Sequence, residues 1–122
     1  MFYRSGIKMT DSEKQILNKN IIKDLIGDDA ELIRKFEIEF LQQAKESIGK
    51  IVAMFNQNDF AAIKEEAHYI KTSAKAIGAE QTADLLQTLE DNALNNDKAT
   101  CKQQIILINQ SLKLVYGAIM NE

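Results

Sequence analysis

The 122-residue chain contains no proline, no tryptophan, one cysteine and one histidine. A single cysteine cannot form an internal disulfide, which excludes a disulfide-stapled scaffold and a cysteine-rich zinc module. A single histidine excludes every catalytic or metal site that needs a pair of them. No apolar run approaches the roughly 20 residues that cross a bilayer, and the N-terminus lacks the apolar stretch of a secretory signal. We therefore expect a cytoplasmic protein that does not enter a membrane.

Charge and length limit the possibilities further. The 15 basic and 18 acidic side chains give a formal net charge of −3. Nucleic-acid binding needs a basic surface that neutralises phosphates, so we expect no nucleic-acid partner. The length corresponds to one domain with its own core. We place this domain at residues 12–122, after a flexible N-terminal tail at residues 1–11.

The absence of proline favours long helices, because a proline inside a helix costs about 3 kcal/mol. In three segments apolar residues recur at spacings of three and four, which is the pattern of an amphipathic helix packed on a core. These stripes are Ile33, Phe36, Phe40, Ala44, Ile48, Ile51 and Phe55; Phe60, Ile63, Ala67, Ile70, Ala74 and Ile77; and Cys101, Ile105, Ile108, Leu112, Val115 and Ile119.

Glycine, asparagine and aspartate mark the helix ends. A short first helix is expected from Ser12 to Leu25, and Gly27-Asp28-Asp29 separates it from the second. Asp59 is expected to cap the third helix, Gly78 to end it, and Asn95-Asn96-Asp97 to separate the fourth from the fifth. Short loops force antiparallel neighbours. The sequence thus predicts an all-α fold, an antiparallel up-down-up-down four-helix bundle with a short additional N-terminal helix.

The single histidine, His68, directly follows a core position of the third helix. At about 100° per residue it faces solvent or the edge of the buried stripe. Lys64, Lys71, Thr72 and Lys75 fall on the same face. The lysines disfavour a charged imidazole, so we expect a neutral, nucleophilic ring beside ammonium groups that attract a phosphoryl group. A solvated histidine among solvated lysines is the alternative interpretation.

The residues around this histidine carry a longer pattern. Ala-His-Tyr-Ile-Lys-Thr-Ser-Ala at residues 67–74, followed by Ile77-Gly78-Ala79 and later by Leu89-Glu90, resembles histidine-containing phosphotransfer (HPt) domains. That family's pattern reads Ala-His-x-Leu-Lys-Gly-Ser-Ala-x-x-x-Gly-Ala. The resemblance covers roughly residues 12–120. It implies a phosphorelay intermediate, in which His68 accepts a phosphoryl group from a receiver-domain phosphoaspartate and passes it to the aspartate of another response regulator.

The resemblance also implies roles for single positions. Lys71 corresponds to the lysine beside the phosphoryl group, and Gly78 to the turn after the histidine helix. Glu90 falls where the family often has Glu or Gln that hydrogen-bonds the imidazole, although a solvated surface acid is an equal alternative. Thr72 departs from the family, which usually has glycine there. Its β-branched side chain is expected to restrict access to His68 or to offer a hydroxyl to the phosphoryl oxygens.

Partners follow from the same resemblance. We expect the chain to be a monomer that meets receiver domains of response regulators and of a hybrid sensor histidine kinase. Lys64, Tyr69 and Lys75 are candidate contacts, with surface charge and core packing as the alternatives. The chain needs no cofactor of its own, since Mg²⁺ belongs to the receiver. Because no nucleotide-binding glycine motif is present, we expect a phosphocarrier and not a kinase.

Two other function classes are alternatives to this interpretation. Glu65 and His68 have the Glu-x-x-His spacing of helical di-iron proteins, but those sites use two such motifs. A non-phosphorylated helical adaptor that binds and inhibits a receiver or kinase is the other alternative, with Thr72 as its best support.

Overall fold

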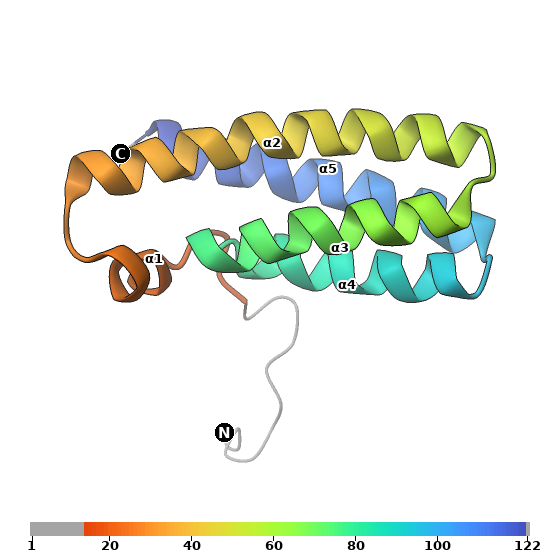
Figure 1. The fold of residues 1–122 in the computed structure, drawn as a ribbon, viewed down its shortest axis with the longest axis horizontal. Coiled ribbons are helices and arrows are strands. Elements are labelled where there is room, and N and C mark those ends of the chain that lie inside the picture. Colours follow the sequence, from red (N-terminus) through yellow and green to blue (C-terminus); the bar gives the residue numbers. More distant parts are fainter. Residues whose placement is uncertain (1–13, 122) are drawn as a thin grey trace, which may run out of the picture.

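The computed structural model describes residues 14–121, so the predicted tail at residues 1–11 lies outside the described residues. Within that range the chain forms α1 (Lys19–Ile26), α2 (Ala30–Asn56), α3 (Phe60–Ile77), α4 (Glu80–Leu94) and α5 (Lys98–Met120). Figure 1 shows α2 to α5 running side by side in alternating directions, with α1 at one end. The predicted four-helix bundle with an additional short helix is confirmed.

Aspartates determine where three of the long helices begin. The side chains of Asp29, Asp59 and Asp97 accept hydrogen bonds from backbone N–H groups in the first turns of α2, α3 and α5. These N–H groups have no partner inside the helix, so an aspartate at the N-cap stabilises each start. At the start of α5, hydrogen bonds from the side chain and backbone of Thr100 lower the pKa of Asp97.

The first helix is shorter than expected. It begins at Lys19 and not at Ser12, because the side chain of Asn18 caps it by accepting the N–H of Asn20. The segment that leads into α1 bonds to the α3–α4 turn and to the start of α4: Asn18 donates its N–H to the carbonyl of Gly78, and the carbonyl of Gln15 accepts the N–H of Gln81. Tertiary hydrogen bonds thus replace the helical ones that the sequence pattern predicted.

Gly78 makes this attachment possible. It ends α3 in the left-handed conformation with φ +87°, which glycine adopts without strain. A Cβ at this position would lie 2.1 Å from the carbonyl oxygen of Asn18. The turn therefore requires glycine both for its backbone angle and for the close approach of the N-terminal segment.

The core sits between the four long helices; it contains the predicted stripes of α2, α3 and α5, together with Leu86, Leu89 and Ala93 of α4 and Ile22 of α1. Phe36 is the exception, with 40% of its surface exposed, while Cys101 is fully buried as a small apolar residue. The core also holds a pair of buried hydroxyls, those of Thr82 and Ser111, which lie 2.7 Å apart between α4 and α5. In the described part of the chain no helix combines the length and apolar character needed to cross a membrane.

Candidate functional site

His68 is presented on the outside of the bundle, where α3 packs on α4. It follows the fully buried Ala67, and 65% of its own side chain is exposed. The expectation that His68 faces solvent is confirmed. Packing of the two helices brings Glu90 beside the ring, with 3.2 Å between His68 Nδ1 and Glu90 Oε1. Glu90 is buried, so it is not a solvated surface acid.

This contact determines which nitrogen of a neutral imidazole carries the hydrogen. An ionised carboxylate only accepts hydrogen bonds, so the hydrogen of a neutral His68 ring belongs on Nδ1 when it bonds Glu90. The other nitrogen, Nε2, then carries the lone pair. The contact orients the ring and leaves Nε2 as the nitrogen without a carboxylate partner.

Lys71 occupies a different place from the one that its spacing suggested. The helical face groups it with the exposed Lys64 and Lys75, whereas the structure buries its side chain between α3 and α4. Its ammonium group lies 2.7 Å from Glu90 Oε2 and donates to Gln87 Oε1 at 2.6 Å. Glu90 is therefore shared between the imidazole and the ammonium group.

Gln87 also contacts Lys71 at this site, and the sequence pattern did not predict it. It lies three residues before Glu90 on α4, which places both on the same helix face toward Lys71. Its amide nitrogen in turn donates to Asp91 at 3.2 Å. The i, i+3 spacing from Glu90 is the signal that could have identified it, once Lys71 was known to point toward α4.

Thr72 stands one helical turn after His68, and both residues are exposed. Its hydroxyl donates to the backbone carbonyl of His68 at 3.2 Å. The hydroxyl hydrogen is therefore used within the helix and not directed at an incoming group. What Thr72 adds beside the imidazole is the bulk of a β-branched side chain.

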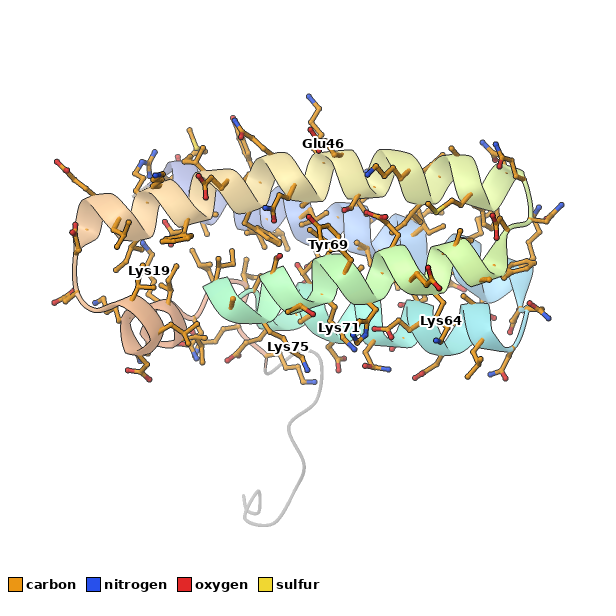
Figure 2. The ribbon with its side chains drawn as sticks, viewed as in Figure 1. Lys19, Glu46, Lys64, Tyr69, Lys71 and Lys75 are labelled. Atoms are coloured by element: carbon orange, nitrogen blue, oxygen red, sulfur yellow. The ribbon has the colours of Figure 1, made fainter. Side chains whose placement is uncertain are left out.

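The remaining predicted contacts are exposed and spread over two edges of α3. Figure 2 shows Lys64 and Lys75 on the edge that faces α4, with Tyr69 nearer α2. All three side chains are exposed, so Tyr69 is not part of the core. Neither lysine forms an ion pair with another residue between 14 and 121. They leave positive charge near the imidazole on both sides along the helix.

The alternative metal site gains no support. Among residues 14–121 there is no group of three or more His, Cys, Asp or Glu side chains that could hold a metal ion. Glu65 is exposed on α3, and the carboxylate that reaches His68 comes from α4.

Fold and site together define a helical bundle that presents one oriented histidine on its surface. Comparison with known families agrees: the Hpt domain family matches residues 38–116 of this chain. The chain belongs to the Hpt family. It is a phosphocarrier domain of phosphorelays and not a kinase.

A solved structure has the same fold. Histidine-containing phosphotransfer protein B (HptB) from Pseudomonas aeruginosa PAO1 superimposes with a TM-score of 0.81, over 87% of this chain and 92% of that chain. Their sequences are 17% identical, so the likeness establishes the shared architecture alone. No match was found among curated protein sequences.

Proposed function

We propose that His68 is the phosphoryl-accepting residue, that it receives the group from the phosphoaspartate of one receiver domain, and that it passes it to the aspartate of another. The observation that carries this proposal is the environment of the imidazole: Nδ1 lies 3.2 Å from the carboxylate of Glu90, while the ring itself is largely exposed. The partners are receiver domains of a hybrid sensor histidine kinase and of response regulators.

The chemistry follows from this geometry. The Nε2 lone pair of His68 forms a bond to phosphorus as the bond between phosphorus and the aspartyl oxygen breaks, and the aspartate leaves as a carboxylate. The product ring keeps its hydrogen on Nδ1 and carries positive charge, which Glu90 offsets at 3.2 Å. The same steps run backwards on the next receiver. Mg²⁺ bound by the receiver supplies further charge stabilisation, so this chain needs no cofactor of its own.

Lys71 serves this step in two ways. Its contact with Glu90 balances a carboxylate that would otherwise repel the incoming phosphoryl oxygens. An ammonium group has three N–H donors, and Glu90 and Gln87 occupy two of them. We assign the third to a phosphoryl oxygen. Lys64 and Lys75 add longer-range attraction along the approach path, and Tyr69 offers an aromatic contact to the docked receiver.

Label transfer tests the proposal. Several purified receiver domains, phosphorylated with labelled acetyl phosphate, are mixed with the protein, and the label is followed in alkali, where phosphohistidine survives and phosphoaspartate does not. We expect transfer to the wild type and none to His68→Gln. A second variant, His68→Gln with Gln43→His, places a histidine at an exposed position of α2 and is also expected to remain unlabelled.

Two outcomes would contradict the proposal. The first is undiminished label on His68→Gln. The second is a wild-type protein that binds a receiver but takes up no label, and whose binding His68→Gln does not change. That is the behaviour of a non-phosphorylated adaptor.

A further inference from the structure

An apolar groove lies on the other side of the bundle from His68. It runs between α2 and α5, the two upper helices of Figure 1, and encloses about 470 Å³. Its apolar lining includes Ile38, Leu41, Ile48, Leu112, Tyr116 and Met120. His68 and Glu90 belong to α3 and α4, so the groove is separate from the phosphotransfer site.

The groove is apolar and open to solvent at the same time. Tyr116 is 56% exposed and Met120 41% exposed, although both line it. On α2 the apolar strip continues one turn beyond Ile48 to Val52, and Val52 is also exposed. From Ile38 to Val52 this strip is about 21 Å long at 1.5 Å per residue. Contiguous exposed apolar surface is characteristic of interaction sites.

The charged residues that line the groove are both basic. Lys45 and Lys113 line it, and neither forms an ion pair with another residue of the described range 14–121. The whole of α5 carries Lys98, Lys102 and Lys113 and no acidic residue. The chain as a whole has a net charge of −3, so this basic surface runs against its overall composition.

We infer that the α2–α5 groove binds an amphipathic helix of a partner protein, whose apolar stripe is flanked by aspartate or glutamate. A helix laid in a groove buries apolar residues at i, i+3, i+4 and i+7. About four turns match the length of the strip. Carboxylates on the flanks of such a helix would meet Lys45 and Lys113 and set its orientation.

The same features argue against other occupants. A two-fold dimer through the groove would bring the same basic patch of both copies together, and the like charges of Lys45 and Lys113 disfavour that arrangement. A membrane surface is broad, whereas the apolar side chains here line a concave groove. A helix of opposite charge fits both the shape and the sign.

The experiment uses a pair of synthetic 18-residue helical peptides that differ only in their flanks, a length of about five turns. Both have leucine at i, i+3, i+4 and i+7; one carries glutamate on both flanks and the other lysine. Fluorescence anisotropy measures their binding to the full chain. We expect saturable binding of the glutamate peptide and at least about tenfold weaker binding of the lysine peptide.

Charge reversal in the protein provides the decisive variant. Lys45→Glu with Lys113→Glu is expected to invert the preference, so that the lysine peptide binds more tightly. The matched control, Lys35→Glu with Lys50→Glu, makes the same charge change at exposed positions of α2 that do not line the groove, and should leave the preference unchanged. Circular dichroism verifies that each variant is folded.

Four results would overturn the inference. Two concern the peptides: no saturable binding of the glutamate peptide, or a preference that Lys45→Glu with Lys113→Glu does not alter. The other two point to a different occupant: a concentration-dependent dimer that Tyr116→Glu dissociates assigns the groove to a second copy, and binding to phosphatidylglycerol vesicles in place of the peptide assigns it to a membrane. His68→Gln should bind the peptide as the wild type does. Failure of the phosphotransfer proposal and failure of this one are therefore distinguishable.

Discussion

Lys71 and Glu90 form an ion pair at 2.7 Å in which the two side chains are only 9% and 10% exposed. Burial fixes the positions of both groups, so the carboxylate that contacts His68 cannot turn freely toward solvent. Lys71 therefore contacts Glu90, the residue that hydrogen-bonds the imidazole of His68. Stability and phosphotransfer are for this reason expected to depend on the same contact.

The first prediction concerns that pair. Lys71→Met leaves the buried carboxylate of Glu90 without its ammonium partner, which we expect to lower the free energy of unfolding by about 3–5 kcal/mol. Urea denaturation measures the change. Replacing both partners, Lys71→Met with Glu90→Leu, should recover most of the stability, because no buried charge is left unpaired.

The control for this prediction is Lys75→Met, an exposed lysine one turn further along α3. Its substitution is expected to change stability by no more than about 0.5 kcal/mol. Equal losses for Lys71→Met and Lys75→Met would show that the ion pair with Glu90 contributes nothing to the fold.

The second prediction concerns the imidazole of His68. Because the chain has one histidine, its ring nitrogens give a single set of NMR signals. Long-range ¹⁵N–¹H spectra at a pH where the ring is neutral should show the hydrogen on Nδ1 in the wild type. In Glu90→Ala it should move largely to Nε2, since the acceptor at 3.2 Å is gone. A wild-type ring with its hydrogen on Nε2 would contradict the assignment.

Phosphotransfer should follow the position of that hydrogen. A hydrogen bond to a charged group is worth about 1.5–3 kcal/mol, so we expect Glu90→Ala to slow label transfer roughly ten- to hundredfold. Glu90→Gln, which keeps an acceptor oxygen, should be affected less. Transfer by Glu90→Ala at the wild-type rate would mean that the carboxylate has no part in the reaction.

Much of the fold could be predicted because it follows from local rules. Apolar spacing identified the buried faces, and Asp29, Asp59 and Gly78 end or begin helices as their chemistry requires. The start of α1 could not be predicted in this way. Asn18 uses its backbone N–H on Gly78, a bond between segments far apart in the chain, and no local pattern contains that information.

The site, too, combines features that the local sequence predicts with features that only tertiary packing determines. The exposure of His68 followed from its offset of one residue from a buried position. The burial of Lys71 did not, because a residue at the edge of the apolar stripe can point to solvent or into the α3–α4 interface. What decides is the presence of Gln87 and Glu90 on α4, which only the packing of the two helices reveals.

The third prediction concerns the α3–α4 turn. Gly78→Ala adds a Cβ that would lie 2.1 Å from the carbonyl oxygen of Asn18, at a φ of +87° that alanine rarely adopts. We expect a loss of about 1–3 kcal/mol and faster hydrogen exchange at the Asn18 N–H. Gly49→Ala is the matched control: the position is helical with nothing within 4 Å of the added Cβ, so stability should be unchanged or slightly higher.

The fourth prediction uses the single cysteine. Burial, with a smaller contribution from Asp97, raises the pKa of the Cys101 thiol. Little thiolate is therefore present near neutral pH, and the sulfur is not accessible to reagents. Alkylation by iodoacetamide should be slow in the native protein and fast in urea, at a rate that follows unfolding. Rapid alkylation without denaturant would show that the N-terminal turn of α5 opens locally.

The last prediction concerns Thr72, whose side chain stands one turn from His68 while its hydroxyl donates to the His68 carbonyl at 3.2 Å. If its bulk restricts the approach of a receiver, Thr72→Ala should raise the rate of label transfer about two- to tenfold. Thr72→Gly should raise it similarly but cost up to about 1 kcal/mol of stability, because glycine is a poor helix former.

Thr72→Ser separates bulk from hydrogen bonding, since it removes the methyl group and keeps the hydroxyl. A rate for Thr72→Ser close to that of Thr72→Ala identifies the methyl group as the obstacle. If instead Thr72→Ala slows transfer and Thr72→Ser does not, the hydroxyl must leave its backbone partner and bond the phosphoryl group during the reaction. That result would overturn the steric role and make Thr72 a direct participant beside His68.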